Sequence, residues 1–146
     1  HDIKPIIVDY MQMLSCNQVS KNDGRQREVA AISGGMKAMA KELKVPVLVL
    51  SQLSRAPEQR EGSIPKLSYL RESGSIEQDA DVVWLLRRPC KCDDDERRED
   101  QTLAVLNIAK NRNGPTKEIE LNFIADYTRF EDRTHGVDQE PGFAAE

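Results

Sequence analysis

Apolar runs alternate with polar stretches along the chain, and the spacing of the apolar residues differs between runs. Four continuous runs rich in β-branched residues, 5–8, 46–50, 82–86 and 103–109, predict strands buried on both faces of a sheet. We therefore expect Trp84 in the core. Between the first two strands, apolar residues recur at three- and four-residue spacing, which predicts an amphipathic helix. Its apolar stripe consists of Val29, Ile32, Met36, Met39, Ala40 and Leu43.

Two buried strands joined by a helix predict a βαβ unit with parallel strands. Gly34 and Gly35 fall inside the helix, where each costs roughly 1 kcal/mol relative to alanine, so we expect a soft middle. Segments 118–124 and 127–130 read as antiparallel strands at one edge. The pattern predicts an α/β fold: a mostly parallel sheet, flanking helices and an antiparallel edge extension.

Composition narrows the class of protein. The 146 residues match one domain, which we place at 1–133, and 134–146 form a polar tail that we expect to be disordered. The net charge of −4 gives no global basic field, so any nucleic-acid site must be local. Cys90 and Cys92 form neither a disulfide framework nor a paired zinc motif. No signal peptide or membrane-spanning run occurs, so we expect a cytoplasmic protein.

Polar side chains follow the first two predicted strands. Asp9 ends the first apolar run, and Gln52 ends the second. Because carboxyl ends of parallel strands share one edge of a sheet, we expect Gln52 near Asp9. A carboxylate at that edge suits the magnesium ion of a nucleotide, and the alternative is that Asp9 caps the following turn.

Two cations, Lys110 and Arg112, follow the fourth apolar run on alternate residues. If the strand pattern persists, both side chains lie on the same side, as a pair reaching into one site requires. The alternative is a hairpin turn at Asn113-Gly114 with two incidental cations.

A second local site is predicted where two short helices meet. The first helix should end at Gly74 in a left-handed cap, and Ser75 with Gln78 forms a capping box for the second. Exposed backbone N–H groups there, with Arg71 beside them, make a small anion site. An ordinary surface turn with a solvated pair of Arg71 and Glu72 is the alternative.

Two further segments lack apolar periodicity. Residues 53–66 are predicted to be a long surface loop. Residues 88–101 carry blocks of opposite charge without apolar anchors, which predicts a solvated loop rather than a metal site.

The chain also resembles a known family in four segments that occur in that family's order: IIVDYMQML, AMAKELKVPVLVLSQLSR, LRESGSIEQDADVV and AKNRNGP. The family is the carboxyl-terminal motor domain of DnaB-type hexameric replicative helicases, which have a RecA-like core. The resemblance runs from about Ile3 to Asp132, and LRESGSIEQDAD is its most specific part.

The resemblance implies roles for the residues at the strand ends. Asp9 looks like the Walker B aspartate, which holds Mg²⁺ of bound ATP through water, and Gln52 looks like the glutamine that senses the γ-phosphate. Lys110 and Arg112 look like a pair that reaches into a neighbouring subunit's nucleotide, with the arginine as an arginine finger.

The resemblance also implies partners. Arg71, Glu72 and Gly74 look like the loop that lines a central channel and holds single-stranded DNA by its phosphates. A homo-hexamer is expected, with primase and a helicase loader as further partners. The implied function is ATP-dependent translocation on single-stranded DNA and unwinding of duplex at the replication fork.

One departure from the family pattern is decisive for activity. The sequence contains no GxxxxGK[ST], so the Walker A half of a RecA-like P-loop core is absent, together with the carboxylate that activates water. We expect this chain to be the second half of a motor, inactive alone. Two alternatives stay open: another RecA-like ATPase of recombinase type, and a non-enzymatic module for DNA or subunit contacts.

Overall fold

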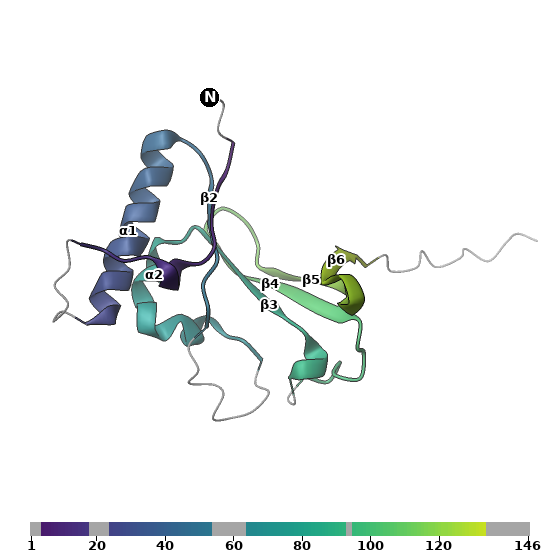
Figure 1. Cartoon of the computed structure of the whole chain (residues 1–146). Helices are drawn as coiled ribbons and strands as arrows, with labels where there is room; N and C mark the ends of the chain where they lie inside the picture. Colours follow the sequence, from purple (N-terminus) through teal and green to yellow (C-terminus); the bar gives the residue numbers. More distant parts are fainter. Residues whose placement is uncertain (1–3, 18–23, 54–63, 93–94, 134–146) are drawn as a thin grey trace, which may run out of the picture.

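A βαβ unit opens the chain, as predicted, and an antiparallel sheet follows it (Figure 1). The computed structural model describes residues 4–17, 24–53, 64–92 and 95–133. The helices are α1 (Arg25–Leu43) and α2 (Gly74–Asp79), and short 3₁₀ helices are η1 (Met11–Met13), η4 (Leu67–Ser73), η5 (Pro89–Lys91) and η6 (Ala125–Tyr127). The strands are β1 (Ile6–Val8), β2 (Val47–Val49), β3 (Val82–Arg87), β4 (Leu103–Asn111), β5 (Lys117–Ile124) and β6 (Arg129–Asp132).

The βαβ unit has the predicted parallel pairing. Strands β1 and β2 are in register from Ile6 opposite Val47 to Val8 opposite Val49. Helix α1 lies beside them, and its buried residues Val29 and Ile32 pack with Met11 of η1. Burial of Val29 and Ile32, with Met36 packed against them, stabilises the unit, whereas Leu43 at the end of the predicted stripe is exposed.

Helix α1 runs without a break through its two glycines. Gly34 and Gly35 lie on the exposed face, where a Cβ atom would meet nothing within 4 Å. The helix ends at Leu43, and Lys44, which follows it, adopts the left-handed conformation with φ 54°. The expected soft middle therefore does not interrupt the helix.

The α/β class is confirmed, but the proportions of the sheets differ from the prediction. In the part of the chain that the structure describes, only β1 and β2 are parallel, and β3-β4-β5-β6 form a separate antiparallel sheet. A parallel return from β3 to β4 would need a crossover, usually a helix. The connecting segment 88–102 has no apolar stripe for one, so the chain pairs back directly.

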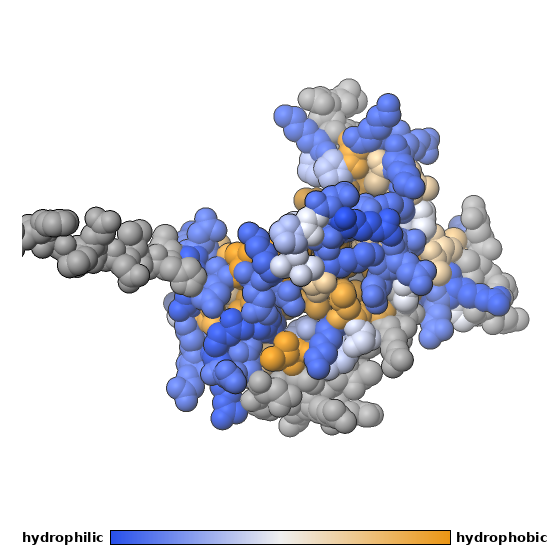
Figure 2. Space-filling view, turned by 180° about the vertical axis from the view of Figure 1, so that it is seen from behind, coloured by the Kyte–Doolittle hydropathy of each residue, from blue (hydrophilic) through white to orange (hydrophobic). Residues whose placement is uncertain are grey.

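Strands β1, β2 and β3 are covered on one face only, whereas in β4 the successive residues Leu103, Ala104 and Val105 are all buried, as predicted for that strand. In β3, Val83 and Leu85 are buried, whereas Trp84 is 54% exposed, so its predicted core position was wrong. Side chains alternate between the two faces of a strand, so Trp84 lies on the face opposite that of Val83 and Leu85. A continuous apolar run does not reveal which of the two faces another layer of the protein covers. In the first sheet, Ile7 and Leu48 are likewise exposed, so neither strand is buried on both faces. Figure 2 shows hydrophobic areas between hydrophilic side chains on one face of the molecule.

The charged segment after β3 is held to the sheet rather than solvated throughout, which corrects the prediction for it. Asp95 is buried and pairs with Arg87 of β3, and Arg97 pairs with Glu118 and Glu120 of β5. Asp93 and Asp94 lie outside the described residues.

Two predicted segments cannot be compared with the structure over their full length. Most of the predicted loop 53–66 and the whole tail 134–146 lie outside the described residues. Among the helices that are described, none has the length and apolar character needed to cross a membrane.

Candidate nucleotide and DNA site

The carboxyl ends of β1 and β2 form a pocket. Asp9 directly follows β1, and Ser51 and Gln52 follow β2 after Leu50. These residues and Tyr10 line a pocket of about 390 Å³. The expected proximity of Gln52 to Asp9 is confirmed, because parallel pairing brings both strand ends to one edge.

The two strand ends remain hydrogen-bonded beyond the ladder. The Leu50 N–H donates to the Val8 carbonyl oxygen at 2.9 Å, and the Met11 N–H donates to the Leu50 carbonyl oxygen at 2.9 Å. The Gln12 side chain then bonds Ser51 and the Gln52 backbone. Sequence reasoning missed Gln12, although a polar residue between Met11 and Met13 was a usable signal.

The pocket carries oxygen-bearing side chains suited to a magnesium nucleotide. Asp9 is exposed, and it supplies the carboxylate, while Ser51 and Gln52 supply a hydroxyl and an amide. Among the described residues, no group of at least three His, Cys, Asp or Glu side chains could hold a metal directly. One carboxylate fits contact through water, since Mg²⁺ usually keeps several waters.

Lys110 and Arg112 lie on the same side, as predicted. Lys110 Nζ donates to the carbonyl oxygens of Glu77 and Gln78, and an Arg112 guanidinium N–H donates to that of Gln78. These carbonyls belong to the last turn of α2, where a helix favours cations. Neither cation lines the pocket at Asp9.

Asp81 connects this cation pair to α1. Its carboxylate lies 3.6 Å from Arg112 and also pairs with Lys37 of α1. The hydrogen bond from Lys37 lowers the pKa of Asp81, and the charge of Arg112 adds to the effect. Asp81 is therefore anionic at neutral pH and holds Arg112 at the end of α2.

The predicted break at Gly74 is absent. Gly74 has right-handed helical angles, φ −49° and ψ −24°, so η4 passes directly into α2 and the left-handed cap was wrong. Ser75 lies inside α2, so it is not an N-cap. A short 3₁₀ helix and an α-helix can share a boundary because their dihedral angles are close. The side chains of Arg71 and Glu72 lie outside what the structure describes.

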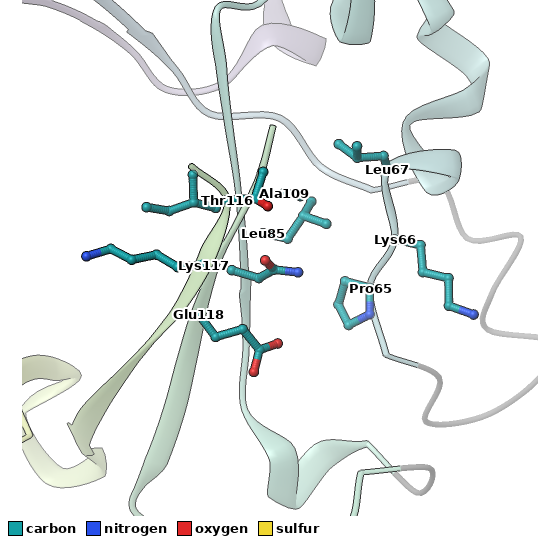
Figure 3. A pocket seen from close by; sticks show the side chains of 10 residues that line it. Pro65, Lys66, Leu67, Leu85, Ala109, Thr116, Lys117 and Glu118 are labelled. Atoms are coloured by element: carbon teal, nitrogen blue, oxygen red, sulfur yellow. The ribbon is translucent and has the colours of Figure 1, made fainter. Parts of the chain in front are cut away.

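A second pocket, of about 430 Å³, lies between the segment before η4 and the antiparallel sheet. Figure 3 shows Pro65 and Leu67 facing Leu85 and Glu118 across it. Glu118 is committed to ion pairs with Arg87 and Arg97. Of the charged residues that line this pocket, Glu118 is therefore occupied by its ion pairs, and the other two are Lys66 and Lys117.

The cysteine pair forms no metal site in the described part of the chain. Cys92 is buried, and its Sγ lies 3.5 Å from the Arg88 carbonyl oxygen, while Cys90 is partly exposed.

Comparison with known families settles the relationship. Residues 1–132 match the family described as the DnaB-like helicase C terminal domain. The chain belongs to this DnaB-like family. That membership selects the DnaB type over a recombinase-type RecA-like ATPase.

Curated relatives in the DnaB-like family are named replicative DNA helicase DnaB. The protein of Leifsonia xyli subsp. xyli is 49% identical over 130 residues, which cover 89% of this chain and 28% of the relative. The protein of Geobacillus stearothermophilus is 47% identical over 125 residues, with 86% and 27% covered. The chain thus spans less than a third of these relatives.

A solved structure of the family has the same fold. It is a DnaB-like replicative helicase, described with its interactions with primase. It matches with a TM-score of 0.76 at 41% identity, and the match covers 89% of this chain and 30% of that chain. A second solved structure, described as an ATPase domain, matches with the same TM-score and identity and covers 89% and 44%.

Proposed function

We propose that this chain is the second half of the motor of an ATP-dependent, hexameric replicative DNA helicase. The observation that carries the proposal is the shared pocket of Asp9 and Gln52 at adjacent ends of parallel strands. Relatives named as replicative helicases over 86–89% of this chain support it.

Asp9 would hold the water shell of Mg²⁺, and Gln52 would contact the γ-phosphate through its side-chain amide. When bound with ATP, Mg²⁺ neutralises charge that develops on the β- and γ-phosphates. Gln52 is exposed in the pocket, so its amide is accessible to a ligand. Because these 146 residues contain no GxxxxGK[ST], a phosphate-cradling loop would have to come from outside them.

Lys110 and Arg112 would act in the nucleotide site of a neighbouring subunit. Their position outside the Asp9 pocket supports action on another subunit's ATP rather than on their own. A guanidinium in that role stabilises charge in the transition state.

The segment with Arg71, Glu72 and Gly74 would line the channel for single-stranded DNA. Contacts to phosphates read charge and spacing without reading bases, which suits translocation on any sequence. Primase and a loader are proposed partners, and the family relative solved for its interactions with primase supports the first. We place the protein in the cytoplasm.

The test uses the complete polypeptide encoded by the reading frame that contains this chain. We expect DNA-stimulated ATPase and strand separation, both lost on Asp9→Asn with assembly unchanged. The isolated 146 residues should show neither activity. Ordinary ATP turnover by the isolated chain would contradict the proposal.

A non-enzymatic module for DNA or subunit contacts is the second candidate. The absence of GxxxxGK[ST] from the sequence favours it. A reading frame with no P-loop followed by an acidic strand end, within about 100 residues upstream, would support the module.

A further inference from the structure

We propose that Gln12 is a positioning residue that fixes the backbone of Gln52 beside Asp9. The inference rests on the proposed function, because it assigns Gln52 the sensing amide of the nucleotide site. It adds a residue that touches neither the nucleotide nor the metal.

The geometry is a two-way amide clamp. Gln12 Nε2 donates to the Gln52 carbonyl oxygen at 3.1 Å, and the Gln52 N–H donates to Gln12 Oε1 at 3.2 Å. Gln12 Nε2 also donates to Ser51 Oγ at 3.0 Å. The side-chain amide therefore bonds both polar groups of one residue's backbone, as a neighbouring strand would.

The clamp extends the β1–β2 pairing past the point where both strands end. Backbone hydrogen bonds join Leu50 to Val8 and Met11. Ser51, which follows Leu50, is instead held by the Gln12 side chain. Without this side chain, the described contacts of the Gln52 backbone to the first strand's segment would be lost. Gln52 would then be free to move relative to Asp9.

Gln12 is itself held in place. Its neighbour Met11 is 3% exposed and packs with Val29 and Ile32 of α1. Arg25 of α1 donates to the Gln12 carbonyl oxygen at 2.8 Å. The clamp is therefore anchored to the helix core, which a positioning residue requires.

Only an amide performs all three contacts at this length. Glutamate keeps an acceptor for the Gln52 N–H but donates to neither oxygen, and methionine has similar length and makes none of the bonds. These two substitutions separate partial from complete loss of the clamp. Gln26→Met, on the exposed side of α1, is the matched control.

The first experiment measures amide hydrogen exchange at Gln52 in the complete polypeptide, without nucleotide. We expect Gln12→Met to speed exchange by about tenfold, and Gln12→Glu by less, since it keeps the acceptor. Unchanged exchange in Gln12→Met, with the fold intact by thermal melting, would overturn the clamp. This readout does not depend on ATPase activity.

The second experiment measures steady-state ATPase. Gln12→Met should lower kcat by up to about 100-fold with little change in KM, because it misplaces a group acting in the transition state. Adding Gln12→Met to Gln52→Ala should cause no further loss, because the clamp acts through Gln52. Fully multiplicative losses would overturn the positioning role.

The same measurements separate the positioning role from the proposed function. If the wild type lacks ATPase, or Gln52→Ala keeps full kcat, the proposed function fails, and hydrogen exchange still decides whether Gln12 holds Gln52. If Gln52→Ala lowers kcat and Gln12→Met does not, only the positioning inference fails.

Discussion

Arg87 and Asp95 form an ion pair in which both side chains are buried. Arg87 Nε donates to Asp95 Oδ2 at 3.0 Å, and the side chains are 5% and 3% exposed. Burial alone would raise the pKa of Asp95, but hydrogen bonds from the Arg97 backbone and from Arg87 lower it overall. The pair ties the charged segment after β3 to the antiparallel sheet.

Replacing Arg87 with methionine should lower the free energy of unfolding by roughly 3 to 5 kcal/mol, because it leaves Asp95 buried and incompletely paired. The double variant Arg87→Met/Asp95→Leu should recover much of that loss. Urea denaturation measures both. Arg129→Met removes an exposed pair with Glu131 and should cost under about 1 kcal/mol. Equal losses for Arg87→Met and Arg129→Met would contradict the prediction.

Asp100 should make stability depend on acid pH. A hydrogen bond from Arg133, with others from Thr102, lowers the pKa of Asp100 from 3.8 to about 2. Because the folded value is the lower one, this contribution is complete above pH 3.8 and is lost as pH falls towards 2. Melting temperatures of the wild type and Asp100→Asn should therefore converge over that range. Parallel curves would count against the assignment.

Gly34→Ala and Gly35→Ala should each stabilise α1 by roughly 1 kcal/mol, because alanine restricts the unfolded chain and favours the helix. A Cβ at either position meets open space. Gly24→Ala is the opposite control, because Gly24 has φ 81° and a side chain there is strained. Chemical denaturation distinguishes the two directions, and a loss of stability in Gly34→Ala would show that the glycine has another role.

Arg112→Ala should lower ATPase of the assembled protein by about 10³- to 10⁵-fold if Arg112 is an arginine finger. Assembly should persist, since Arg112 is half exposed at the surface. Mixing Arg112→Ala subunits with Asp9→Asn subunits should restore part of the activity, because intact fingers then meet intact pockets. No restoration in mixed assemblies would place both residues in one subunit's site.

Trp84 should behave as an exposed tryptophan. It is the single tryptophan of the chain and is 54% exposed on β3. Iodide should therefore quench its fluorescence strongly in the native 146-residue chain, nearly as in urea. Weak native quenching would return Trp84 to a buried position.

The positions of the helix and of the strands in the βαβ unit could be predicted from the local spacing of apolar residues. The stripe through Val29, Ile32 and Met36 predicted α1, and the βαβ order predicted that Asp9 and Gln52 meet. Both inferences depend on periodicities that are local to the backbone. The shift from η4 into α2 at Gly74 was not predictable, because glycine adopts right-handed and left-handed angles alike.

Which face of a strand is covered, and which residues far apart in the sequence are in contact, could be learned only from the tertiary structure. Apolar runs at Ile7 and Trp84 look the same in sequence whether or not a second layer covers them. The ion pair of Arg87 with Asp95 joins a strand to a segment whose charges predict solvation.

The sequence by itself determined the βαβ unit, the polar residues at its strand ends and the resemblance to a motor domain. Only the tertiary structure decided that the later strands pair antiparallel, that Lys110 and Arg112 rest on α2, and that Gln12 holds Gln52. The physical reason is the separation along the sequence of the residues that interact. Periodicity reports each segment's own backbone, whereas the Gln12 clamp joins residues 40 positions apart and exists only when parallel pairing brings them together.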